Sequence, residues 1–213
     1  MPNESFRKVK TKHGNLDLRV SQGHFATSHS HLNYYIDITT QKTCLSEAKA
    51  VAKELASYYN TNTIVDTVLC LDGTEVIGTC LARELTNSGY LNINAQQPIY
   101  VLTPEHTTGS QLIFRDNSIP AVKGKRVLIL AASVSTGYTA QAAVEAIKYY
   151  EGQVAGICAV LSSQDTCAGY VVRSVFDTRD LDNYFSLPSH ECPLCKAGKK
   201  LDALVNAFGY SKL

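Results

Sequence analysis

Residues 125–139 have the sequence Lys-Arg-Val-Leu-Ile-Leu-Ala-Ala-Ser-Val-Ser-Thr-Gly-Tyr-Thr, and this stretch decides the fold class. The apolar run over 126–131 predicts a buried strand, and the hydroxyl-rich segment after it predicts a turn. Apolar residues then follow helical spacing over 139–150, and the run over 154–161 is again typical of a strand. Strand, turn, helix and strand in succession form a βαβ unit, which predicts a parallel sheet.

The turn in this unit carries several hydroxyl side chains and one glycine: Ser133, Ser135, Thr136, Gly137 and Thr139. Hydroxyl groups, free backbone N–H groups and the positive end of a helix dipole together suit a phosphate dianion. An ordinary strand-to-helix turn with a serine cap fits the same residues about equally well. The local chemistry therefore leaves both interpretations open.

The flanking sequence continues the alternation of helices and strands. Apolar spacing predicts a helix over 45–59, a strand over 65–71, a helix from the Asp72-Gly73-Thr74 turn to Leu85, and strands over 99–102 and 171–175. We also expect a short helix after Cys195, on Leu201, Leu204, Val205 and Phe208. The polar segment 103–124 is expected to be an irregular loop of the kind that often forms a functional lid.

The composition excludes several classes of protein. Charged residues make up 18% of the 213 residues, and 20 Lys+Arg against 19 Asp+Glu give a net charge of +1. This balance argues against a nucleic-acid partner. The sequence contains neither an apolar run long enough to span a bilayer nor an apolar secretion signal at its beginning, so we expect no membrane partner. Seven scattered cysteines, several among apolar neighbours, are typical of reduced thiols in a cytoplasmic protein.

The 125–139 stretch resembles the phosphoribosyl pyrophosphate motif of type I phosphoribosyltransferases. Three further segments, in the right order, are similar to the orotate phosphoribosyltransferase branch. They are Gly23-His-Phe25 with the following 28–37, the turn at 72–74, and Cys192-Pro-Leu-Cys-Lys-Ala-Gly198. The resemblance implies an α/β fold: a type I phosphoribosyltransferase-like core with a central parallel sheet flanked by helices, and a small hood. It also implies a single domain over 1–213, with the hood formed by about 1–40 and 180–213, and a homodimer.

The same resemblance assigns roles to individual residues. It implies a phosphate-binding loop at Ser133, Ser135, Thr136, Gly137, Tyr138 and Thr139, a pyrophosphate loop at Asp72, Gly73 and Thr74, and a base pocket at Tyr34 and Tyr35. The expected ligand is a phosphorylated ribose or a nucleotide.

The chain differs from the family at positions where the family carries charged side chains in its active site. Ala131 and Ala132 replace the two acids that hold the ribose hydroxyls, and Leu102-Thr103 lacks the cations of the mobile loop. Ser162-Ser163 occupies the place of an Asp-Arg pair that binds orotate. Losing one such electrostatic contact commonly costs about 10²–10³ in rate. We therefore expect an orotate phosphoribosyltransferase-like protein of pyrimidine nucleotide metabolism that binds its ligand with degenerate catalytic residues, and that uses Mg²⁺ only if it is active.

Two alternatives remain open. The chain is an active transferase with altered base specificity if other cations rebuild the site, and His106, Arg115 and Lys123 are the candidates. The second alternative is a zinc or redox module in the tail, on His190, Cys192 and Cys195, with a fourth ligand from Cys167 or a partner subunit. Our main expectation is that no metal is bound there. His24, His29 and His31 are expected in a polar surface loop.

Overall fold

The computed structural model describes residues 6–10, 16–87, 92–108 and 111–213. Its central sheet has six strands in the order β10-β11-β9-β8-β4-β5. Their bounds are β4 Thr67–Cys70, β5 Tyr100–Leu102, β8 Arg126–Val134, β9 Gln153–Ser162, β10 Thr166–Cys167 and β11 Tyr170–Asp177. All neighbours pair in parallel except the edge strand β10, so the predicted α/β class is confirmed.

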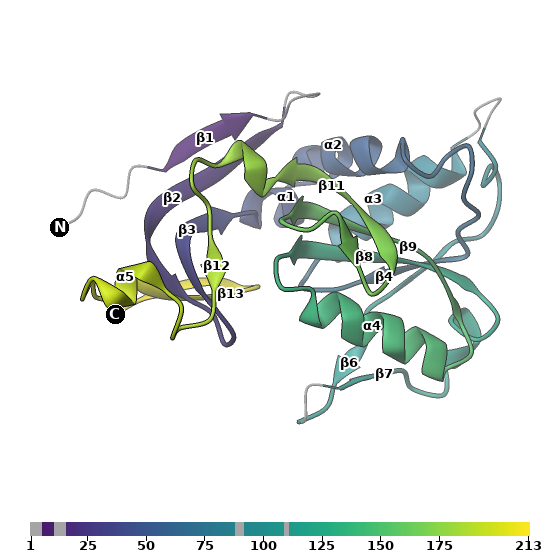
Figure 1. Ribbon diagram of the computed structural model, residues 1–213. Coiled ribbons are helices and arrows are strands. Elements are labelled where there is room, and N and C mark those ends of the chain that lie inside the picture. Colours follow the sequence, from purple (N-terminus) through teal and green to yellow (C-terminus); the bar gives the residue numbers. More distant parts are fainter. Residues whose placement is uncertain (1–5, 11–15, 88–91, 109–110) are drawn as a thin grey trace.

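Helices cover both faces of this sheet, as Figure 1 shows. Helices α2 (Leu45–Ala56) and α3 (Glu75–Thr86) lie on one face, and α4 (Tyr138–Tyr149) lies on the other. The short helix α1 (Thr39–Thr43) precedes α2. Among the described residues, no helix is long and apolar enough to cross a membrane.

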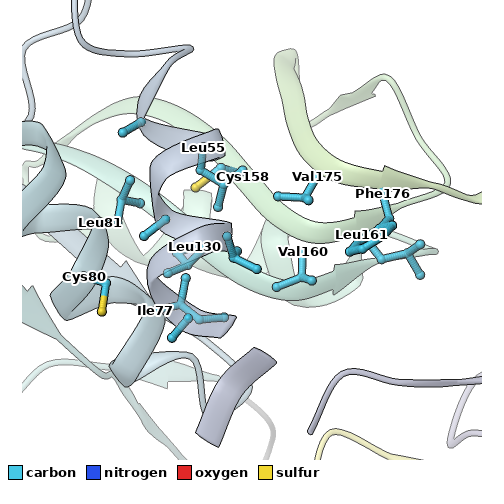
Figure 2. Close-up of a cluster of buried hydrophobic side chains, with 14 of the residues drawn as sticks. Leu55, Ile77, Cys80, Leu81, Leu130, Cys158, Val160, Leu161, Val175 and Phe176 are labelled. Carbon is cyan, nitrogen blue, oxygen red and sulfur yellow. The ribbon is translucent and has the colours of Figure 1, made fainter. Parts of the chain in front are cut away.

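The core divides into two apolar clusters because side chains alternate along each strand. Figure 2 shows the first, in which Leu55 of α2 and Leu81 of α3 pack with Leu130 of β8; all three are fully buried. The second lies beneath α4 and contains Ile129 and Ala131. The alternation thus directs Ala131 into the apolar layer beneath α4 and places Ala132 on the opposite face of β8.

A second sheet lies beside the core, on the left of Figure 1, and we call it the hood. Its strands follow the order β12-β3-β2-β13-β14, with β1 paired to β2. Their bounds are β1 Arg7–Lys10, β2 Asp17–Ala26, β3 His31–Asp37, β12 Ser186–Leu187, β13 Ala203–Asn206 and β14 Gly209–Lys212. The strands come from both segments for which the resemblance implied a hood, although 1–5 and 11–15 lie outside the described residues.

The helix expected after Cys195 is wrong. Helix α5 is confined to Pro193–Lys196, and the following residues form the β13–β14 hairpin. Ala203 and Val205 are buried while Leu204 and Asn206 are exposed, which is the alternation of a strand. Ala203 pairs in parallel with Phe25, so a contact across the whole chain overrides the local apolar spacing.

The 103–124 segment also differs from the irregular loop that we expected. It contains a small antiparallel pair, β6 (Glu105–His106) with β7 (Leu112–Ile113), and a short 3₁₀ helix, η1 (Ile119–Ala121). Phe114 is buried and its ring lies 5.2 Å from that of Tyr150, which ties the segment to the end of α4. Residues 109–110 of this segment lie outside the described residues.

Candidate functional site

A cavity of about 280 Å³ lies between the hood and the core. The hood contributes the loop at 27–30, and the core contributes Asp72 and the segment 132–140. Because β4 and β8 are parallel neighbours, the loops after their carboxyl ends meet at one edge of the sheet. Ligands of open α/β sheets characteristically bind at this edge.

The six residues that the resemblance assigned to phosphate all line this cavity: Ser133, Ser135, Thr136, Gly137, Tyr138 and Thr139. Gly137 has φ +82°, and a Cβ there would lie 3.0 Å from the sulfur of Cys167. The Ser163 hydroxyl donates to the carbonyl of Ser135 at 3.0 Å and helps to hold the turn. Helix α4 begins directly after it without a side-chain cap, so the N–H groups of its first turn face outward without helical partners.

The predicted pyrophosphate loop separates into residues with different surroundings. Asp72 lines the cavity and adopts φ +58°, followed by Gly73 at φ +77°. Thr74 is fully buried, and its hydroxyl donates to the carbonyls of Leu71 at 2.8 Å and Leu130 at 3.2 Å. Thr74 therefore holds the loop to β8, and its side chain is not among those that line the cavity.

Lys42 is a cavity residue that the sequence did not reveal. Only 8% of it is exposed, and its ammonium group donates to the carbonyls of Asp72 at 3.0 Å and of Ala207. Burial lowers the pKa of Lys42, while the nearby carboxylates of Asp72 and Glu75 oppose this change. Burial likewise raises the pKa of Asp72, against the influence of Lys42. The lysine thus connects the β13–β14 turn to the core loop beneath the cavity.

Tyr34 and Tyr35, the predicted base pocket, both line the cavity but both rings are buried. The Tyr34 hydroxyl donates to the carbonyl of Asp182 at 3.2 Å. The Tyr35 ring lies 4.9 Å from that of Tyr210, and burial raises the pKa of Tyr35 to about 12. Both rings are therefore held by the protein on the hood sheet.

The candidate replacement cations lie outside the cavity lining. Arg115 forms a two-pronged ion pair with the exposed Glu105, at 3.0 and 2.6 Å. Lys123 pairs with Glu151 at 3.0 Å, and His106 is exposed on β6. Of the described residues that line the cavity, Lys42 is the only lysine or arginine.

The tail residues are arranged differently from the expected set. His190 lies 3.3 Å from Glu191 and does not belong to the cluster of possible metal ligands that contains the cysteine pair. The cysteines instead face His24 and His31, and His24 is only 1% exposed. The expectation that His24 lies in a polar surface loop is therefore wrong. The sulfur of Cys167 lies 3.5 Å from the carbonyl of Gly137, beneath the phosphate-type loop.

No family model and no curated protein matches the chain at the level of sequence. The structure, in contrast, matches orotate phosphoribosyltransferase from Mycobacterium tuberculosis with a TM-score of 0.53. The identity is 20%, and the match covers 76% of this chain and 91% of that one. The fold is type I phosphoribosyltransferase-like.

Other phosphoribosyltransferases share this fold. Adenine phosphoribosyltransferase from Trypanosoma brucei, solved with AMP, pyrophosphate and ribose-5-phosphate, matches with a TM-score of 0.51 and 12% identity over 76% of this chain and 78% of that chain. UMP synthase from Leishmania donovani matches with a TM-score of 0.54 and 21% identity, over 76% of this chain and 34% of that longer chain. At these identities the likeness shows the phosphoribosyltransferase-like fold, and function has to be argued from the cavity.

Proposed function

We propose that this chain binds a phosphoribosyl or nucleoside-monophosphate ligand in the cavity between hood and core, and transfers the phosphoribosyl group weakly or not at all. One observation carries the proposal. The cavity is lined both by the hydroxyl-rich N-terminus of α4 and by Ala132. Ala132 occupies the position at which the enzymes that the chain resembles carry an acid. The end that suits a phosphate is present, and the acid that would hold the ribose is replaced.

The phosphate end of the cavity supports the binding half of this proposal. Helix α4 extends over Tyr138–Tyr149, long enough to present a full first turn of N–H groups. Ser135, Thr136 and Thr139 add hydroxyls that line the same space. Backbone N–H groups at a helix N-terminus and hydroxyl donors both stabilise a phosphate dianion.

The sugar end of the cavity supports the transfer half. Of the described lining residues, Asp72 is the only one with a carboxylate. Its carboxylate accepts a hydrogen bond from the backbone of Ala132 and lies close to the Lys42 ammonium. Mg²⁺ prefers several oxygen ligands in near-octahedral geometry. One carboxylate beside a buried cation does not fit this ion, so we propose that ligand binding does not require Mg²⁺.

The size of the cavity indicates the size of its ligand. Pockets for drug-sized molecules measure about 300–1,000 Å³, and this cavity of about 280 Å³ lies just below that range. A sugar phosphate or a mononucleotide is therefore a better candidate than a dinucleotide. Orotate phosphoribosyltransferase from M. tuberculosis was solved with phosphoribosyl pyrophosphate, and this ligand class agrees with the proposal. We extend the proposal to a pyrimidine nucleotide and a homodimer because 23–37, 72–74 and 192–198 resemble the orotate branch. We extend it to the cytoplasm because the scattered cysteines are typical of reduced thiols.

Calorimetry tests the binding half. Ribose 5-phosphate, UMP and AMP are titrated into the purified protein, with and without Mg²⁺. Thr136→Val removes one hydroxyl from the cavity lining and should weaken binding about tenfold or more, since a hydrogen bond to a charged group is worth about 1.5–3 kcal/mol. Thr79→Val is the control: it changes an exposed threonine of α3 whose hydroxyl donates to the backbone carbonyl of Glu75, and it should leave binding unchanged. Absence of binding by all three ligands would overturn the proposal.

A pyrophosphate-release assay tests the transfer half. The protein is incubated with phosphoribosyl pyrophosphate, Mg²⁺, and orotate or a panel of other bases. We expect release at, or only slightly above, the rate without protein. Rapid turnover with any base would contradict this half and favour an active transferase with a rebuilt site.

A further inference from the structure

The cysteine pair of the tail meets two histidines of the hood hairpin. His24 lies on β2, His31 begins β3, Cys192 directly precedes α5, and Cys195 lies within that helix. Two cysteine thiols and two imidazoles thus converge from segments that are about 160 residues apart in the chain. Their four ligand atoms all lie within 4.8 Å of one another.

The distances within this cluster fit a tetrahedral metal site. Zn–S bonds of about 2.3 Å and Zn–N bonds of about 2.0–2.1 Å place tetrahedral ligand atoms about 3.3–3.8 Å apart. Here His24 Nε2 lies 3.1 Å from His31 Nδ1 and 3.5 Å from Cys192 Sγ. Cys195 Sγ lies 3.6 Å from His24 Nε2 and 3.2 Å from His31 Nδ1. Four of the six separations between the ligand atoms are therefore close to the edges of a zinc tetrahedron.

The outer contacts of His24 favour one tautomer of its neutral ring. Its Nδ1 lies 2.9 Å from the carbonyl of Lys199 and 3.2 Å from that of Lys200. A carbonyl can only accept, so in the neutral ring Nδ1 carries the proton and the lone pair of Nε2 faces the cysteines. A backbone carbonyl behind the ring is the usual arrangement around a metal-bound histidine.

The backbone around His24 is built to hold this position. The β2–β3 register shifts between Gln22 and Phe25, and the bulge contains Gly23 and His24. The His24 N–H donates to the carboxylate of Asp202 at 2.7 Å. A Cβ on Gly23 would lie 2.8 Å from that same carboxylate, so the backbone can approach Asp202 this closely only because residue 23 is a glycine. The bulge therefore aims the imidazole at α5.

We propose that His24, His31, Cys192 and Cys195 hold a structural zinc ion that fastens α5 to the β2–β3 hairpin. Four nitrogen and sulfur ligands leave no open coordination position, which is typical of structural sites. Binding converts both thiols to thiolates and releases their protons to solvent. A Cys192–Cys195 disulfide would instead leave the Nε2 lone pair of the buried His24 without its metal.

The proposed zinc also bears on the ligand cavity. The loop at 27–30 lies between the two histidine ligands and lines that cavity. A metal that fixes His24 and His31 holds both ends of this loop. The site is thus a support for the hood, and the zinc takes no part in the proposed ligand chemistry.

Metal analysis of untagged protein tests the proposal. We expect one zinc per chain, and retention of zinc in His190→Ala and in Cys44→Ser, which change the neighbouring histidine and an exposed cysteine. Cys192→Ser and Cys195→Ser should each lower zinc affinity about tenfold or more. A chelator should lower the Tm of the wild type by about 5 °C or more and should lower that of the two serine variants by less.

Cobalt titration of the wild type tests the site without any variant. Co²⁺ bound by two thiolates and two imidazoles gives the visible absorption bands of a tetrahedral complex, and added zinc should remove them. The proposal would be overturned if the purified protein contained no zinc and gave no tetrahedral absorption bands on cobalt titration. Recovery of the chain with Cys192 and Cys195 joined in a disulfide would also overturn it and would favour a redox pair. Both readouts are independent of ligand binding in the cavity.

Discussion

The imidazole of His29 lies against the ring of Tyr138, with 5.5 Å between the ring centroids and 47° between the ring planes. His29 belongs to the hood loop, and Tyr138 is the first residue of α4. Both residues line the cavity. This pair therefore joins the hood to the end of the core where we propose that phosphate binds.

Tyr138→Ala should weaken binding of ribose 5-phosphate about two- to tenfold, because an aromatic pair contributes about 0.5–1.5 kcal/mol. A calorimetric double-mutant cycle with His29→Ala should show coupling between the two residues. Tyr149→Ala removes a tyrosine that is 81% exposed at the other end of α4 and should leave affinity unchanged. Strictly additive losses at positions 29 and 138 would show that the ring contact does not contribute to binding.

Gly137→Ala should lower affinity for phosphate-containing ligands about tenfold or more. The alanine backbone would have to keep φ +82°, which side chains disfavour, and its Cβ would lie 3.0 Å from Cys167 Sγ. The turn would therefore have to move. Gly169→Ala is the matched control, because Gly169 has φ +85° with no atom within 4 Å of the added Cβ. Both variants should lose some stability in urea denaturation. An equal loss of affinity in both would contradict the role assigned to the turn.

Asp66→Asn should lower the free energy of unfolding at pH 7 by about 1–2 kcal/mol. Asp66 accepts from the Arg126 guanidinium at 2.7 and 2.8 Å and from its backbone N–H at 2.8 Å. The figure is modest because Arg126 is 41% exposed and solvent screens the pair. Asp165→Asn, in a pair that is 70–79% exposed, should change stability by less than about 0.5 kcal/mol.

The same pair predicts a direction for the pH dependence. The Arg126 side chain lowers the pKa of Asp66 below its ordinary value of 3.8, so the folded state binds fewer protons there than the unfolded state. The stability that the Asp66–Arg126 pair contributes is fully present above pH 3.8, the ordinary pKa. It is lost as the pH falls from that value through the lower pKa of the folded state. Urea denaturation at pH 7 and pH 3 should therefore show the difference between wild type and Asp66→Asn shrinking in acid.

Gly78→Ala should destabilise the protein by about 1–3 kcal/mol, although alanine ordinarily favours a helix. A Cβ at this position of α3 would lie 2.2 Å from the sulfur of Cys70 on β4. Cys70→Ala removes that sulfur, so thermal unfolding should show Gly78→Ala to be milder in the Cys70→Ala background. If the cost is the same in both backgrounds, the close approach of α3 to β4 is not its cause.

The parallel core could be predicted from the sequence because its signals are local. The strand and helix periods over 126–161 depend on neighbouring residues, and β8, α4 and β9 begin within one residue of the predicted positions. Collinear motifs then placed the phosphate-type turn on the sheet edge that forms the cavity. Lys42 was missed because its role depends on carbonyls 30 and 165 residues away, and a lone lysine in a polar segment carries no pattern.

The hood was harder to predict because long-range contacts build it. Leu201, Leu204, Val205 and Phe208 have helical spacing, yet the segment forms a strand since Ala203 and Leu204 pair with Phe25 and Ala26. The metal-type cluster was missed for the same reason. His190 is close to the cysteines in sequence, whereas His24 is brought to them by the bulge and by Asp202. Proximity along the chain favoured the wrong histidine.

The parallel pairing of β13 with β2 determines when the hood sheet can be completed during synthesis. Every strand of the central sheet lies within 67–177, so that sheet can assemble while the tail is still on the ribosome. Strand β2 is made early and pairs with β1 over 17–20, but its Phe25–Ala26 part has to wait for Ala203 and Leu204. In the interval this part of β2 is unpaired on one side, and an unpaired strand edge can pair with another chain.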